Sequence, residues 1–155
     1  MAKIRKLSSA RIKKISGGKE PPKLVEEFMI RRGFDPDSCL QQKTAEIATW
    51  SVPLSDEEEL EITLEGLNRP AETTLYMGVN ILTVPVRELY KTLIAVLTIA
   101  DTLIGAKLSL VNYDIVLSVT QYTSNLGVDD IDYYFELLSR QKVIMQDAII
   151  DEIHH

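Results

Sequence analysis

The segment Glu58–Glu65 restricts the fold of this 155-residue chain more than any other segment. Leu60, Ile62 and Leu64 alternate in it with glutamates and a threonine. Successive side chains of a β-strand point to opposite faces of a sheet, so this pattern predicts a strand with one apolar face and one polar face. We therefore expect a sheet whose apolar face is covered by helices.

Two further strand-like runs, Thr44–Leu54 and Thr73–Thr83, flank this segment. The links between the three runs are short, which predicts an antiparallel meander. Farther along the chain, Lys107–Val111 and Ile115–Thr120 lie on either side of residues 112–114. This arrangement predicts a hairpin with a three-residue loop.

Helical periodicity marks three segments. The first is Lys23–Arg32, which ends at Gly33, a residue suited to a helix C-terminal cap. The second is Val86–Gly105, and the third begins near Asp129 and reaches about Asp151. The resulting order α-β-β-β-α-β-β-α predicts an α+β fold, in which one twisted, mainly antiparallel five-stranded sheet packs with helices.

The segment Val86–Gly105 is apolar on nearly all sides. A helix that packs on one sheet needs a single apolar stripe, so the second stripe needs another cover. That cover is either a third helix of the chain or the same helix of a second subunit. We expect a homodimer in which a two-fold axis pairs this face with itself. The residues predicted for the dimer interface are Tyr90, Leu93, Ile94, Leu97 and Ile104.

The charge is unevenly distributed. The net charge is -6, yet residues 1–19 contain basic and no acidic side chains. We expect a basic, flexible N-terminal arm over residues 1–20 and a single domain over residues 21–153. Basic arms attract nucleic acid and anionic membranes, whereas an arm that only solubilises the chain or folds back on the acidic body is the alternative. The candidate nucleic-acid-binding residues are Lys3, Arg5, Lys6, Arg11, Lys13 and Lys14.

Side chains that carry most enzyme chemistry are scarce. The two histidines, His154 and His155, lie at the C-terminal end, and Cys39 is the single cysteine. Zinc sites and nucleophile–histidine pairs need residues that the interior of this chain lacks. The sequence therefore predicts a protein that is not an enzyme, with no cofactor and no metal. The lone cysteine fits a cytoplasmic protein, and the lack of a long apolar run predicts no transmembrane segment.

Two aromatic residues are candidates for partner binding. Trp50 lies in the first strand-like run and Tyr76 in the third. A large ring in a strand is either a core residue or an anchor for a partner, because aromatic rings dominate the energetics of both. We nominate Trp50 and Tyr76 as partner-binding residues.

The order of elements resembles that of the type III secretion chaperones and of the YbjN-like bacterial family. The resemblance covers about residues 22–152 and is carried by the strand Glu58–Glu65, the helix Val86–Gly105 and the hairpin and helix from Lys107 to Ile150. It implies a small, acidic, cytosolic and often dimeric protein without catalytic residues. The chaperones hold an extended segment of a partner protein. The basic arm departs from the usual pattern.

We therefore expect a non-enzymatic chaperone- or adaptor-like protein that holds a segment of an unidentified partner protein. An exposed sheet face, a sheet edge or a groove between helices would serve this purpose. The alternative is a nucleic-acid-associated regulator that uses the basic arm. The salt dependence of binding distinguishes the two functions, because binding through phosphate contacts weakens steeply as the salt concentration rises.

Overall fold

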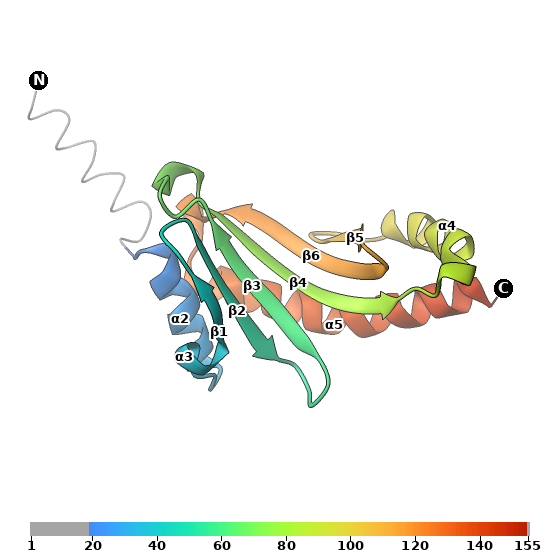
Figure 1. Cartoon of the computed structure of the whole chain (residues 1–155), viewed down its shortest axis with the longest axis horizontal. Helices are drawn as coiled ribbons and strands as arrows, with labels where there is room; N and C mark the ends of the chain where they lie inside the picture. The colour runs from blue at the N-terminus through green and yellow to red at the C-terminus, as the bar shows by residue number, and fades with distance from the viewer. Residues whose placement is uncertain (1–18, 155) are drawn as a thin grey trace, which may run out of the picture.

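The computed structural model describes residues 19–154, which form one antiparallel sheet and its covering helices (Figure 1). The six strands pair in the order β1-β2-β3-β4-β6-β5, and every pair is antiparallel. The strands are β1 (Leu40–Lys43), β2 (Ile47–Pro53), β3 (Glu59–Glu65), β4 (Thr74–Thr83), β5 (Lys107–Val111) and β6 (Asp114–Tyr122).

Four α-helices and three short 3₁₀ turns accompany the strands in the described residues. The helices are α2 (Pro21–Arg31), α3 (Pro36–Cys39), α4 (Leu89–Ala100) and α5 (Val128–Ile153). The 3₁₀ turns are η1 (Pro70–Glu72), η2 (Val86–Glu88) and η3 (Thr123–Asn125). Within residues 19–154, no helix combines the length and apolar character needed to cross a membrane.

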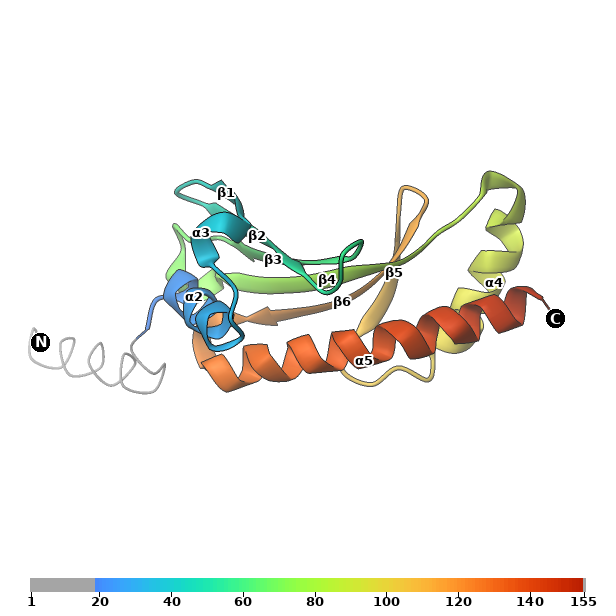
Figure 2. The same ribbon diagram turned by 90° about the horizontal axis from the view of Figure 1, so that it is seen from below.

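One face of the sheet supplies the core. The register pairs Ile62 of β3 with Trp50 of β2 and with Met77 of β4, and all three side chains are buried. Helix α5 runs along this face, with α2 beside its first turns and α4 beside its C-terminal half (Figure 2). Phe28 of α2 and Phe135 of α5 pack ring against ring, with centroids 5.4 Å apart. The apolar side of the alternating strand pattern is therefore the covered side.

The α+β class and the main order of elements are confirmed, but the strand count of five is wrong. The additional strand is β1, a four-residue edge strand whose side chains are mostly exposed. The hydroxyl of Thr44 accepts hydrogen bonds from the N–H groups of Glu46 and Ile47, which turns the chain between β1 and β2. The predicted single strand Thr44–Leu54 is for this reason a turn followed by β2.

Two predicted boundaries are also wrong. The helix expected over Val86–Gly105 is the turn η2 followed by α4, which ends at Ala100. The hydroxyl of Thr102 donates to the carbonyl of Ile99 at 2.7 Å and competes with the helical hydrogen bonds there. The loop of the β5–β6 hairpin has two residues, because Val111 pairs with Asp114. Its first residue, Asn112, has a φ of 57°, a conformation that asparagine tolerates.

Candidate functional site

The sheet face opposite α5 carries a groove with a volume of about 490 Å³. In Figure 2 the β1–β2 side of the sheet and the β5–β6 hairpin both rise on this face, away from α5. The groove lies between them and draws on five neighbouring strands and on Gln41 of the edge strand β1. Its lining residues are Gln41, Thr49, Trp50, Ser51, Glu59, Glu61, Tyr76, Gly78, Asn80, Val111, Asp114 and Val116.

Tyr76 lies on the floor of this groove. Its ring covers Gly78, the next residue on the same face of β4, where there is no side chain to displace it. Burial and then the charge of Glu61 raise the pKa of Tyr76, and a hydrogen bond with Ser118 acts in the opposite direction. The phenol of Tyr76 therefore stays protonated at neutral pH and presents a polar edge inside an otherwise half-buried aromatic surface.

The groove is acidic. Glu59 and Glu61 of β3 lie on one side of Tyr76 in the sheet order, and Asp114 begins β6 on the other. Within residues 19–154 these three carboxylates have hydroxyl partners and no ion pair with a lysine or arginine. The lining contains no basic side chain. The groove thus favours a ligand that brings positive charge.

The two nominated aromatic residues are placed differently. The side chain of Trp50 is 1% exposed and belongs to the core, because it occupies the apolar side of the alternation in β2. Trp50 lines the groove from that position, whereas Tyr76 lies on the polar side of β4. Sequence reasoning missed Gly78, Asn80 and Asp114. The sequence signal for them is the alternation of polar and apolar residues in the strands, whose apolar residues predicted the core.

A second candidate surface is the outer side of α4. Thr92, Ala95, Val96 and Ile99 are buried against the rest of the fold. The opposite side remains apolar and exposed in the single chain. Of the residues predicted for a dimer interface, Tyr90 is 78% exposed, Ile94 48%, Leu97 74% and Ile104 89%, whereas Leu93 is partly buried. Because α4 ends at Ala100, Ile104 lies in the loop that follows it.

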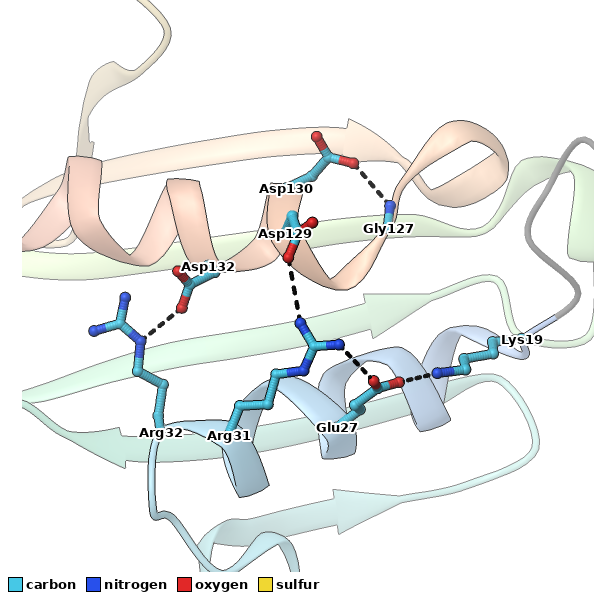
Figure 3. A network of polar contacts seen from close by, with 8 residues as sticks. All are labelled: Lys19, Glu27, Arg31, Arg32, Gly127, Asp129, Asp130 and Asp132. Carbon is cyan, nitrogen blue, oxygen red and sulfur yellow. Dashed lines mark hydrogen bonds and ion pairs between the residues drawn. The ribbon is translucent and has the colours of Figure 1, made fainter.

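Ion pairs join α2 to the first turns of α5 (Figure 3). Arg31 pairs with Glu27 at 2.9 Å and with Asp129 at 3.3 Å. Arg32 pairs with Asp132 at 2.6 Å, and Lys19, the first described residue, pairs with Glu27. Glu27, Asp129 and Asp132 are therefore matched by neighbouring cations.

The metal-ligating side chains and the Cys39 thiol of the described residues bear on metal binding and on nucleophilic chemistry. Residues 19–154 bring together no group of three or more histidine, cysteine, aspartate or glutamate side chains suited to a metal ion. Burial, followed by the charges of Asp35 and Glu59, raises the pKa of the Cys39 thiol. A thiol with a raised pKa is a poor nucleophile at neutral pH.

No protein-family model and no curated protein matches this sequence. Solved structures match it in fold. The structure of the ExsC–ExsE complex aligns with 81% of this chain and 90% of its own chain, at a TM-score of 0.55 and 11% identity. The structure of the HopA1–SchA chaperone–effector complex aligns with 81% of this chain and 91% of its own, at a TM-score of 0.54 and 12% identity.

The chain has a type III secretion chaperone-like fold. A further similar structure is the Yersinia pestis type III secretion chaperone SycH in complex with a stable fragment of YscM2. It aligns with 79% of this chain and 97% of its own, at 18% identity and a TM-score of 0.47. The chaperone half of the sequence resemblance is thereby confirmed at the level of fold, whereas the YbjN-like half stays a prediction.

Proposed function

We propose that this chain is a non-enzymatic, chaperone- or adaptor-like protein that holds a segment of a partner protein in the groove of its open sheet face. The observation that supports this most is the groove itself, which draws on five neighbouring strands and Gln41 of the edge strand and has no catalytic group assembled beside it. A groove lined by neighbouring strands of an open sheet face has room for an extended peptide segment.

The fold supports the same proposal by analogy. Two similar structures, with TM-scores of 0.55 and 0.54, are both complexes, and one is a chaperone–effector complex. Fold similarity alone does not assign function, so the groove residues carry the proposal.

We further propose that the protein acts as a homodimer. The exposed apolar side of α4 is the surface that a second copy would cover, with Tyr90, Ile94 and Leu97 at its centre. Contiguous apolar surface of this kind marks an interaction site in most soluble proteins. The lining of the groove includes no residue of α4, so the two surfaces are made of different residues.

The experiment is site-specific photo-crosslinking in cells that express the chain. A photoreactive residue at Asn80, which is exposed in the groove, is expected to capture a protein, whereas the same residue at Asp147 on α5 is not. Asn80→Trp fills the groove and is expected to lower recovery of that protein at least tenfold. The matched variant Asp147→Trp leaves recovery unchanged. Equal capture from both positions, or adducts that disappear with nuclease, contradicts the proposal.

The alternative function rests on the candidate residues Lys3, Arg5, Lys6, Arg11, Lys13 and Lys14, which lie outside the described residues. Binding of nucleic acid through them stays a prediction. The acidic character of the described domain disfavours any contribution of the sheet face to such binding.

A further inference from the structure

The groove and the N-terminal arm have complementary charges. Residues 1–18 contain six basic and no acidic side chains, whereas the rest of the chain contains 11 basic and 23 acidic side chains. Opposite charge on two parts of one chain favours their association, since the effective concentration of a tethered segment is high. The question is which acidic surface of the domain remains available to the arm.

Several acids near the start of the domain are already paired, whereas Glu20 and Glu26 have no ion pair among residues 19–154. Glu27 is held by Lys19 and Arg31, and Asp129 by Arg31 (Figure 3). Arg32 holds Asp132 and Glu136 in the same way. A cation from the arm would have to displace an existing partner at each of these positions, with little net gain in free energy.

The acids of the groove are different. Glu59 accepts a hydrogen bond from Ser51, Glu61 accepts one from Thr63, and Asp114 accepts one from Thr83. Hydroxyl partners leave the charge of a carboxylate uncompensated. These carboxylates also line one groove, so a cation there meets several of them at once, although Glu59 and Glu61 are exposed and Asp114 is partly buried.

The arm is long enough to reach the groove. Eighteen residues of extended chain span up to about 60 Å. Residue 19 precedes α2, which contacts α3, and α3 leads directly into β1 and lies beside it in both views of the fold (Figures 1 and 2). Gln41 of β1 lines the groove, so the route from the arm passes around the β1 edge of the sheet.

We propose that the basic arm, residues 1–18, docks in the acidic groove of its own chain through Glu59, Glu61 and Asp114. The docked arm occupies the same surface as the partner segment. If the proposed function holds, a partner must displace the arm, and neutralising the arm increases affinity for the partner. The docking itself is tested without any partner, so its failure is distinguishable from failure of the proposed function.

The test is paramagnetic relaxation in the full-length protein. Cys39→Ser removes the single native thiol, and Ser9→Cys carries a nitroxide on the arm. At low salt we expect at least twofold loss of signal at the amides of Gly78 and Asn80, and none at Asp147. Raising the salt from about 0.01 M to about 1 M shortens the Debye length from about 30 Å to about 3 Å and is expected to restore the signals.

Matched charge variants locate the contact. The triple variant Glu59→Gln, Glu61→Gln, Asp114→Asn is expected to abolish the broadening. The control triple variant Asp147→Asn, Asp151→Asn, Glu152→Gln removes the same charge from the end of α5 and is expected to leave it intact. Thermal unfolding of both variants shows that each is folded.

Three results overturn the proposal. The first is broadening at the first turns of α5 in place of the groove, and the second is no broadening anywhere in the domain. The third is broadening that vanishes when the nitroxide-labelled protein is diluted with protein that carries no label. Broadening within one chain survives such dilution, so its loss would place the arm on another copy. Broadening that persists on dilution and disappears in the groove variant supports it.

Discussion

The ring of Tyr76 occupies the space that a side chain at residue 78 would need. A Cβ atom added to Gly78 would lie 2.7 Å from Cζ of Tyr76, closer than real Cβ contacts allow. Gly78→Ala must therefore push the ring out of its half-buried position and away from Ser118. We expect this variant to lower the free energy of unfolding by about 1–3 kcal/mol, and to lower the raised pKa of Tyr76 toward its ordinary value.

The same tyrosine gives a dependence on alkaline pH. A raised pKa keeps Tyr76 protonated in the folded protein at pH values where the unfolded chain ionises. Its contribution to stability is thus complete below about pH 10 and is lost as the pH rises further. Tyr76→Phe is expected to show a smaller loss of stability above pH 10 than the wild type. Ring-proton titration and unfolding in urea measure both effects, and an unchanged Tyr76 titration in Gly78→Ala would contradict this account.

The homodimer is tested by placing a charge on the outer side of α4. Leu97 is 74% exposed in the single chain, so Leu97→Asp costs the isolated fold little. In a two-fold interface the substitution buries two like charges, and we expect the dissociation constant to rise at least about 100-fold. Tyr133→Asp, at an exposed position on the first turns of α5, is the matched control. Sedimentation velocity measures the oligomeric state of both variants. A Leu97→Asp protein that remains dimeric would contradict the proposed interface on α4.

The ion pair between Lys142 and Glu58 allows the energetic cost of a buried charge to be measured. Lys142 on α5 is 4% exposed and pairs with Glu58, which precedes β3. Removal of Glu58 leaves the ammonium group of Lys142 uncompensated. Because Glu58 is half-exposed, Glu58→Ala is expected to cost about 1–3 kcal/mol, less than the loss of a partner from a fully buried pair. Lys142→Met removes the buried charge and is expected to be neutral or stabilising. A larger loss for Lys142→Met than for Glu58→Ala would be the opposite of this prediction.

Arg32 joins α2 to α5 by geometry that lysine lacks. Its guanidinium pairs with Asp132 and Glu136 and lies 4.8 Å from the ring centroid of Phe135. The hydrogen bond with Asp132 is the main reason that the pKa of Arg32 is raised. We expect Arg32→Lys to cost about 1 kcal/mol and Arg32→Ala about 2 kcal/mol.

Urea unfolding measures both losses, with a surface pair as the control. Arg69 is more exposed and pairs only with Glu72, so Arg69→Ala should change stability by less than about 0.5 kcal/mol. If Arg32→Lys were as stable as the wild type, the contacts of the Arg32 guanidinium with the two carboxylates and the Phe135 ring would contribute nothing to stability.

Much of the fold was predictable because its signals are local. The alternation in Glu58–Glu65 predicted a strand with one buried side, and Leu60, Ile62 and Leu64 are buried. Gly33, predicted to end the first helix, has a φ of 84° just after α2. The last helix, predicted to begin near Asp129, begins at Val128, and Asp130 in its first turn accepts a hydrogen bond from the N–H of Gly127.

The errors have physical causes that periodicity does not encode. β1 has no apolar face, so its sequence carries no strand signal, and it is a strand only because β2 offers it an edge. The end of α4 depends on a hydroxyl of Thr102 bonding to the backbone. Trp50, for which both a core and a partner-binding role were open, is buried because it lies on the apolar side of β2, and its role in partner binding stays a prediction.

The sequence by itself determined which segments become strands and helices and which side of each is apolar, because these properties repeat within a few residues. The tertiary structure decided what those sides meet. Glu61 of β3 and Asp114 of β6 line one groove because both strands pair with β4 in the sheet. Along the chain, β4 and β6 are separated by α4 and β5. A groove that needs the register of several strands at once, and an outer α4 side that no other element covers, exist only when the sheet is assembled.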